Sequence, residues 1–223
     1  MSMWEKFVKC IPPMLQGGAL TLALTLCGIL IGVFLGLIVA LGRISRNRTI
    51  SSICWTYIWV FRGTPLLLQI FFIFFALPLI KLPLIGGTIR LEAFPAAVIA
   101  LGLNSAAYLA EIIRAAIQSI DSGQMEAARA VGMTYRQAMF RIIVPQSYRR
   151  LIPPVGNEFI MLLKDSALVS VIAMTELLRT ARLMTNATGD AFYYLPAGAI
   201  YLLLTSIFTK VFDRLERKYS VYL

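Results

Sequence analysis

The hydrophobic residues of this chain gather in long segments that contain no charge. Four such segments, without a single Asp, Glu, Lys or Arg, cover residues 11–42, 63–80, 93–110 and 191–209. About 20 apolar residues are enough for a helix to cross the hydrocarbon core of a membrane. Each segment therefore predicts a membrane-spanning helix. We expect a fifth near residues 151–175, although Glu158, Lys164 and Asp165 interrupt its apolar character.

A break interrupts the second expected helix, which begins near Ser51. The string Phe61-Arg-Gly-Thr-Pro65 contains a proline without a backbone N–H and a glycine that loosens the chain before it. We therefore expect residues 51–61 to lie at the cytoplasmic interface and residues 66–80 to cross. The other expected elements are an amphipathic lead-in at 4–14, a first span at 17–41, an external loop at 81–92, a third span at 94–117, an outer-surface helix at 175–185 and a fifth span at 193–212.

Glycines recur every four residues in the first expected span, at Gly28, Gly32 and Gly36. Residues four apart lie on one face of a helix, and small residues on such a face let a second helix approach closely. The pattern predicts that this face of the first span is a helix-packing surface.

Composition agrees with a membrane protein. Of the 223 residues 59 % are hydrophobic and the mean hydropathy is +0.78, well above the values of soluble domains. Of the 21 Lys and Arg, 12 follow the first, third and fifth expected spans and 6 lie on the other side. The positive-inside rule then places the N-terminus outside and the C-terminus in the cytoplasm. We expect an all-α integral membrane protein with five transmembrane helices in a single domain, residues 1–223.

Several kinds of chemistry are excluded by what the sequence lacks. There is no histidine, so a histidine proton relay and a histidine-ligated metal are excluded. The three cysteines are isolated and show no zinc-ligand spacing. No Gly-Lys pair occurs, so the chain has no Walker A phosphate loop and does not hydrolyse ATP alone. We expect no catalytic residue, no metal and no cofactor in this chain.

A polar, basic loop at residues 121–150 separates the third and fourth expected spans. Asp121-Ser-Gly-Gln124 predicts a capped helix start, and Gly132 suits the left-handed residue that closes a helix. Thr134-Tyr-Arg-Gln137 is a second capping box, and Pro145 is expected to end the second helix. DNA-binding proteins share this helix-turn-helix pattern. The flanking spans and the apolar Ile142-Ile-Val144 argue against nucleic acid and favour docking of a cytoplasmic partner over a plain loop.

Polar residues within two expected spans are candidate binding residues, because a charge at membrane depth costs about 2.5–3.5 kcal/mol. Asn104, Tyr108 and Glu111 share one face of the third span, and Glu158 and Asp165 share one face of the fourth. They predict a pocket near the midplane, in which carboxylates hold an ammonium group or cationic side chain while Asn104 and Tyr108 orient a carboxylate. The structural alternatives are an ion pair with Arg114, bridges to Lys164 or Arg62, polar contacts between dimer helices and interhelical hydrogen bonds. Ser166 and Ser170 either line the pocket or satisfy backbone groups freed by a break at Lys164-Asp-Ser166.

The chain resembles the membrane subunits of ATP-binding-cassette importers. Glu126-Ala-Ala, Gly132, Ile142 and Pro145 look like their EAA loop, with Val144 in place of a leucine. The strings at 61–65, 104–114 and 157–172 resemble the polar amino acid permeases among them. The resemblance implies a type I importer permease fold that works as a dimer, with itself or with a similar chain, in a prokaryotic plasma (inner) membrane. It also implies two cytoplasmic ATPase subunits, which bind the ATP and Mg, and an extracytoplasmic amino-acid-binding protein.

In such an importer the loop at 121–150 would insert a short coupling helix into a groove on the ATPase. The small residues Ala127, Ala128 and Gly132 would permit close approach of the backbones. Glu126 could pair with a basic residue of the partner, and Arg129 and Arg136 with acidic ones. Pro145 completes the set of coupling residues that the resemblance implies.

Two carboxylates without an obvious balancing cation favour a basic amino acid (arginine, lysine or histidine) as the transported substrate. Relatives that carry glutamine have similar acidic positions, so a glutamine or glutamate importer of the same class stays open. Two other classes remain. An ion-coupled secondary transporter could use Glu111, Glu158 and Asp165 as coupling carboxylates, but it does not explain the EAA loop. A membrane scaffold explains the loop but not the acidic residues.

Overall fold

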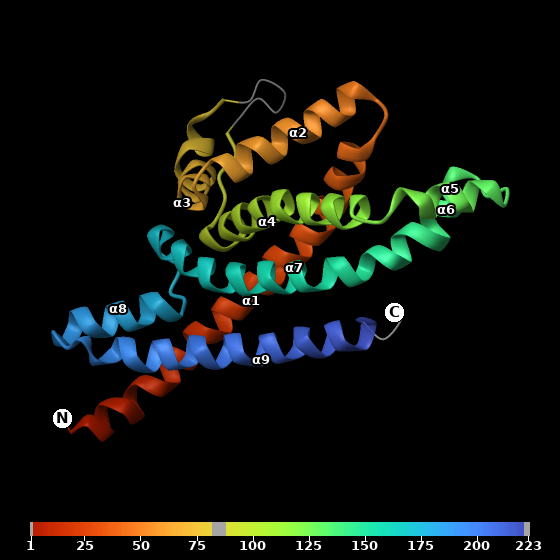
Figure 1. The fold of residues 1–223 in the computed structure, drawn as a ribbon. Helices are drawn as coiled ribbons and strands as arrows, with labels where there is room; N and C mark the ends of the chain where they lie inside the picture. Colours follow the sequence, from red (N-terminus) through yellow and green to blue (C-terminus); the bar gives the residue numbers. More distant parts are fainter. Residues whose placement is uncertain (1, 82–87, 221–223) are drawn as a thin grey trace.

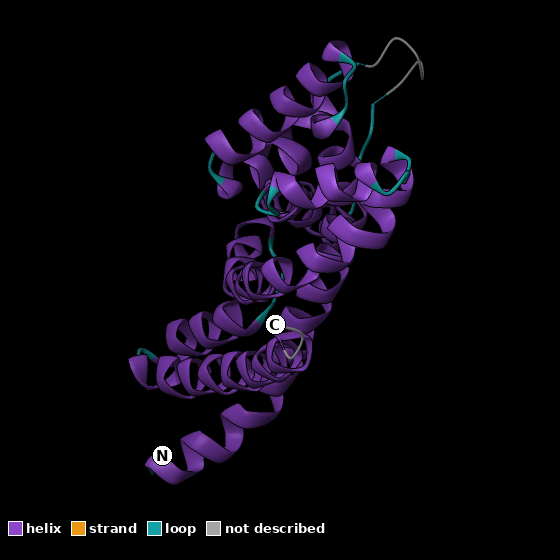
Figure 2. Ribbon diagram, turned by 45° about the vertical axis from the view of Figure 1, so that its right-hand side comes forward, coloured by secondary structure: helices purple, strands orange, loops and turns teal. Residues whose placement is uncertain are grey.

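The computed structural model describes residues 2–81 and 88–220, and these form helices joined by short connections, with no strand among them (Figure 2). In chain order the α-helices are α1 (Met3–Ile44), α2 (Arg48–Gly63), α3 (Leu66–Phe71), α4 (Ala93–Gln118), α5 (Ser122–Ala130), α6 (Tyr135–Ala138), α7 (Val144–Asp165), α8 (Leu177–Thr188) and α9 (Tyr194–Ser220) (Figure 1). Wider π-helical segments occupy Phe72–Ala76 and Met139–Ile143, and tighter 3-10 segments occupy Leu77–Leu79, Ser166–Ile172 and Ala191–Tyr193.

The first helix is longer than the sequence predicts. Instead of a separate lead-in, α1 runs unbroken for 42 residues through Pro12 and Pro13, about 63 Å at 1.5 Å per residue. The fully buried Cys10 and Met14 pack with residues of α8 and α9 on either side of these prolines. Tertiary packing therefore keeps the helix continuous where the two prolines favour a break.

The contact between α1 and α4 confirms the packing role of the glycine face. A Cβ atom on Gly32 would lie 2.9 Å from the Ser105 hydroxyl, and one on Gly36 would lie 3.0 Å from the carbonyl oxygen of Ala106. Both distances are below ordinary van der Waals contact. The two helices therefore approach so closely that only hydrogen fits at these positions.

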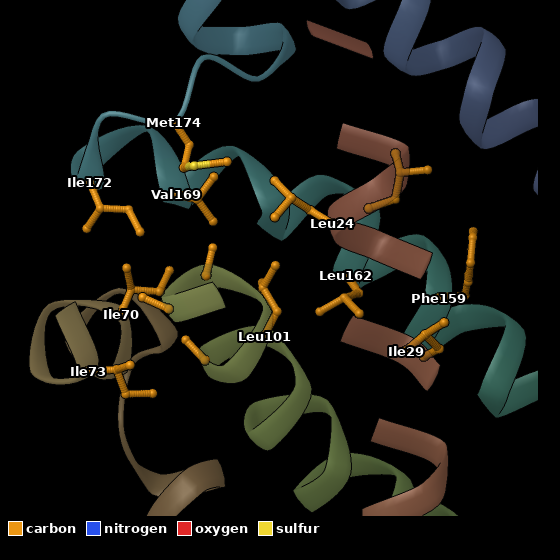
Figure 3. Packing of buried hydrophobic residues seen from close by; sticks show 14 of the residues in the cluster. Leu24, Ile29, Ile70, Ile73, Leu101, Phe159, Leu162, Val169, Ile172 and Met174 are labelled. Atoms are coloured by element: carbon orange, nitrogen blue, oxygen red, sulfur yellow. The ribbon is translucent and has the colours of Figure 1, made fainter. Parts of the chain in front are cut away.

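The main apolar core forms where α3, α4, α7 and the following 3-10 segment meet α1. Figure 3 shows Leu24 of α1, Ile70 of α3, Leu101 of α4 and Leu162 of α7 converging on this core, which also includes Val169, Ile172 and Met174. These side chains are nearly or completely buried. The core thus joins α3 and the turn after it to the remaining helices, whereas Ile58 of α2 packs in a separate cluster with Ala40, Ala110 and Ile113.

The break in the second expected helix is confirmed. The helix axis turns by 104° between Arg48–Gly63 and Leu66–Leu79. Pro65 stands at the start of α3, where its missing N–H leaves no helical hydrogen bond unmade. Residues 82–87 of the expected external loop lie outside the described residues.

The prediction that Pro145 ends a helix is wrong. The chain widens into a π-helical turn at Met139–Ile143, where the N–H of Val144 donates to the carbonyl of Met139. Pro145 then lies in the first turn of α7, which continues for 22 residues to Asp165. The first turn of a helix tolerates a proline because its N–H has no partner there.

Three described helices are long and apolar enough to cross a membrane, namely Met3–Ile44, Ala93–Gln118 and residues 191–219, and the bent pair α2–α3 makes up to four. The expected fourth span corresponds to α7 and the 3-10 segment after it, but its polar residues keep α7 outside that group.

We predict that Gly36→Ala destabilises the protein although alanine is the better helix former. The new methyl would press on the backbone carbonyl of Ala106, and overpacking of this kind costs about 1–3 kcal/mol. Gly18→Ala is the matched control, because its Cβ would meet only Ile200 at 3.7 Å. Thermal unfolding in detergent should show a lower midpoint for Gly36→Ala alone, and equal midpoints for the two variants would contradict the close α1–α4 contact.

Candidate functional site

Two amide side chains hold the break between α2 and α3. The Gln69 Nε2 donates to the Phe61 carbonyl at 2.8 Å and to the Thr64 carbonyl at 3.1 Å. The Asn104 Nδ2 of α4 donates to the Gln69 Oε1 at 3.0 Å and to the Phe61 carbonyl at 3.3 Å. These bonds satisfy carbonyls that the interrupted helix leaves without partners. Asn104 therefore takes the interhelical hydrogen-bonding role that the sequence analysis left open. Gln69, the one amide side chain of α3, is a residue that sequence reasoning missed.

Each of the predicted acidic residues of α4 and α7 has a polar or charged neighbour. Ser105 donates its hydroxyl to the Glu158 Oε1 at 2.8 Å, which fixes the carboxylate across the α4–α7 contact. Asp165 is close enough to interact electrostatically with Glu158. Glu111 forms an ion pair with Arg114, its neighbour one turn further along α4. The spacing along each helix correctly predicted that Glu158 and Asp165 would share one face.

A cation lies near these carboxylates, namely Arg62, which the sequence analysis named as a possible partner for them. The Arg62 guanidinium lies 5.2 Å from the centre of the Tyr108 ring. It also lies within electrostatic range of both Glu111 and Glu158. The 104° turn after α2 brings Arg62 to this position. The cluster formed by Arg62, Tyr108, Glu111, Glu158 and Asp165, called the Arg62 cluster below, therefore offers both signs of charge.

The two serines lie behind this cluster in the 3-10 segment. The Ser166 side chain is completely buried and donates to the Leu163 carbonyl at 2.8 Å. The Ser170 carbonyl accepts a hydrogen bond of 2.6 Å from the Arg179 guanidinium. The Ser166 hydroxyl thus satisfies a backbone carbonyl where the α-helix changes to a 3-10 helix, which is the second alternative of the sequence analysis.

A buried carboxylate that sequence reasoning did not select joins α8 to α9, beside a contact between α8 and α1. Glu176 caps α8 by accepting from the N–H groups of Leu178 at 2.8 Å and Arg179 at 2.7 Å. Its carboxylate also accepts from the Tyr201 hydroxyl of α9 at 2.9 Å. Thr21 of α1 accepts from the Leu177 N–H at 3.3 Å. The only sequence signal is an acidic residue directly before a helix start.

The polar loop forms a small helical module beyond the end of α4 (Figure 1). Gly132 has φ +83°, and the N–H of Met133 donates to the Ala128 carbonyl at 3.0 Å, as expected of a glycine-closed helix end. Thr134 and Gln137 form the predicted capping box. At the first helix start, however, Asp121 caps Gly123, and Gln124 bonds to Gln146 instead.

The predicted coupling residues divide between two faces of this module. Ala128 is 6 % exposed and packs inside, as does Ala138 of α6. The solvent face carries most of the predicted residues, which are Glu126, Ala127, Arg129, Gly132 and Arg136, together with the 75 % exposed Val131. Pro145 is exposed at the base of the module.

The described part of the chain holds no group of three or more Cys, Asp or Glu side chains that could bind a metal ion. The Arg62 cluster presents charges of both signs, which can pair with an ammonium or a carboxylate group.

Known proteins match nearly the whole chain. A family model described as "Binding-protein-dependent transport system inner membrane component" matches residues 11–221. The L-cystine transport system permease protein TcyB of Bacillus subtilis (strain 168) is 38 % identical over 222 residues, covering 98 % of this chain and 92 % of that protein. The arginine transport system permease protein ArtQ of the same organism is 42 % identical over 211 residues, covering 93 % of each. A solved structure described as an amino acid ABC transporter with histidines has a TM-score of 0.88 and 42 % identity, covering 98 % of this chain and 99 % of that chain.

We predict that Asn104→Ala lowers stability, because it leaves the Gln69 Oε1 buried without its donor. A buried polar group without a partner costs about 1–3 kcal/mol. Asn186→Ala, at an exposed position of α8, is the matched control. Thermal unfolding in detergent measures both. If the two variants unfold at the same temperature, Asn104 does not hold the break, and a direct role at a ligand becomes the better explanation.

Proposed function

The chain belongs to the family of binding-protein-dependent transport system inner membrane components, and from that premise we propose that it is the permease subunit of an ATP-driven importer of polar amino acids. The module at 121–150 is the observation that carries this proposal. It stands at one end of the helix bundle with an exposed face of small and charged residues (Figure 1). A secondary transporter needs no such docking surface.

In the proposed mechanism the module couples ATP hydrolysis to the spans. Two copies of a separate ATPase subunit bind ATP and Mg, and each receives the α5–α6 turn of one permease subunit in a groove. Glu126, Arg129 and Arg136 pair with charged residues of that groove. The Thr134 capping box and the Gly132 turn make the module rigid. Closure of the ATPase pair then moves the attached helices as rigid bodies.

The proposed topology has five spans with the N-terminus outside and the C-terminus in the cytoplasm. It counts α1, the broken α2–α3 pair, α4, α7 with its 3-10 segment, and α9. The positive charges at 43–48, 129–150 and 210–218 support this orientation, because they then all face the cytoplasm. The proposed complex contains a second permease subunit, identical or similar, and receives substrate from an extracytoplasmic binding protein.

The Arg62 cluster is the proposed substrate site. An amino acid carries an ammonium and a carboxylate group, and this cluster presents partners for both. Arg62 would hold the substrate carboxylate, and Glu158, fixed by Ser105, would hold the ammonium group. Asp165 is then left to meet a cationic side chain, which supports a basic amino acid as the substrate. Glutamine remains the second candidate, since an amide can also donate to Asp165.

We predict that ATP-driven uptake into vesicles carrying this chain and its ATPase prefers arginine or lysine over histidine, glutamine and glutamate. Asp165→Asn should lose that preference, because it removes the charge assigned to the side chain. Glu158→Gln should weaken uptake of every substrate, because it removes the partner of the shared ammonium group. Asp213→Asn, an exposed position near the end of α9, is the matched control.

Either of two results would contradict this assignment. If the parent carries glutamine as well as arginine, the basic preference is wrong. If both variants transport like the parent, the carboxylates serve only the structure and selection occurs in the external binding protein. Uptake that continues without ATP would favour an ion-coupled transporter instead.

We predict that Gly132→Glu abolishes uptake while the purified chain stays folded, because the new side chain crowds the docking turn. The matched control is Gly189→Glu, at the C-terminal end of α8. Gly189 also has a positive φ of +69°, and neither glycine has an atom within 4 Å of a built Cβ. The two variants therefore bear similar backbone strain at opposite ends of the molecule. Co-purification with the ATPase should fail for Gly132→Glu alone, and retained binding with uptake would refute the docking assignment.

A further inference from the structure

A cavity of about 780 Å³ opens between the first turns of α7 and the last turns of α9. It lies apart from the Arg62 cluster and from the exposed α5–α6 turn. Its polar wall contains Arg141, Tyr148, Arg149, Arg150, Glu216 and Tyr219. Nothing in the proposed transport mechanism uses these side chains.

The packing of α7 against α9 explains why the cavity forms there. The rings of Phe159 and Phe208 lie 4.5 Å apart, and Gly156 lets Phe212 approach the α7 backbone. Toward the C-terminal end of α9 the two helices separate (Figure 1). The space is bounded on its third side by Ile120, at the end of α4.

The wall of the cavity is positively charged. Among the described residues that line the cavity, Arg141, Arg149 and Arg150 outnumber the one acidic side chain, that of Glu216. The Arg150 guanidinium donates to the Ser119 carbonyl, which places it at the α4 side of the cavity. Arginine is the side chain best suited to phosphate, because its planar fork of N–H groups matches two phosphate oxygens.

The remaining wall is apolar. Ile120, Ile142 and Pro145 line the cavity beside the arginines. Tyr148 and Tyr219 are 50 % and 45 % exposed, as is usual for tyrosines at a membrane interface. The apolar part of α9 ends at Thr209 and its charged part begins at Lys210, so the proposed topology places Glu216 and Tyr219 of the cavity wall on the cytoplasmic side of the hydrocarbon core.

We propose that this cavity binds a phosphate group, and that the arginines hold the phosphate while the apolar wall contacts what is attached to it. Basic pockets between helices on the cytoplasmic side bind the headgroups of anionic lipids. The same chemistry would accept a soluble phosphate, and the experiment below distinguishes the two sources. The inference rests on the proposed cytoplasmic placement of this end and is independent of the transported substrate.

The cavity wall is joined to the module at 121–150 by a hydrogen bond, so a ligand bound in the cavity could affect that module. Gln146 of the cavity wall donates to the Gln124 side chain of α5 at 3.2 Å. A phosphate held at the base of α7 therefore lies one hydrogen bond away from the helix that is proposed to dock the ATPase.

The test is retention of phosphatidylglycerol by the full chain, purified with its ATPase partner from vesicles of phosphatidylcholine with phosphatidylglycerol added. Native mass spectrometry counts the bound lipids. We expect the double variant R141Q/R150Q to retain roughly tenfold less phosphatidylglycerol than the parent, since both lost charges face the site. The matched control is R46Q/R48Q, which removes two exposed arginines at the cytoplasmic start of α2.

A second variant keeps the test decisive if the double variant does not fold. Glu216→Gln removes the one carboxylate of the wall and should raise phosphatidylglycerol retention, an effect that a damaged protein does not produce. Inorganic phosphate is added in a separate arm. If it displaces the lipid at millimolar concentration, the site takes soluble phosphate as well, and if it does not, the lipid headgroup is the source.

Equal phosphatidylglycerol retention by the parent, R141Q/R150Q and E216Q would overturn the proposal. So would loss of ATPase binding in R141Q/R150Q with unchanged lipid retention, because the cavity would then be a contact with the ATPase. Lipid retention needs no transport, so failure of this inference is distinguishable from failure of the amino acid assignment.

Discussion

The close approach of α1 and α4 is the contact on which the other features depend. Gly32 and Gly36 leave no room for a side chain against Ser105 and Ala106. Within a membrane, helices gain little from hiding apolar surface, because the lipid is equally apolar, so association relies on close packing. The α1–α4 pair supplies it and places Asn104 and Ser105 at fixed positions. Asn104 donates a hydrogen bond to Gln69 at the α2–α3 break, and Ser105 donates one to the Glu158 carboxylate.

The interrupted backbone shows how polar groups are accommodated inside an apolar bundle. The turn of 104° between α2 and α3 leaves carbonyls that an apolar surrounding cannot satisfy. Gln69 and Asn104 donate to these carbonyls, and the same turn carries Arg62 toward the acidic residues of α4 and α7. The break therefore needs polar side chains to bond its carbonyls, and it also lies next to the candidate binding site. Both reasons explain why polar residues concentrate around it.

The buried charges divide into two groups by their partners. Glu176 accepts three hydrogen bonds and is completely buried, so its role is to fasten α8 to α9. Glu158 has one hydrogen-bond donor and faces Arg62, and Asp165 lies beside it with part of its surface exposed. A partly exposed carboxylate with most of its acceptor capacity unused can still bind a ligand, whereas Glu176 is buried and already accepts three hydrogen bonds. This difference is the physical basis for assigning the substrate to the Arg62 cluster.

The sequence by itself determined the apolar segments, the break at Phe61 to Pro65, the glycine face of α1 and the turn at Gly132. Each of these depends on local chemistry, namely hydropathy over about 20 residues, a missing N–H, a missing Cβ or a positive φ. Only the tertiary structure decided the continuity of α1 through Pro12 and Pro13, the continuation of the chain past Pro145, the pairing of Asn104 with Gln69 and the place of Arg62. Those features depend on which distant residues pack together, and no local pattern contains that information.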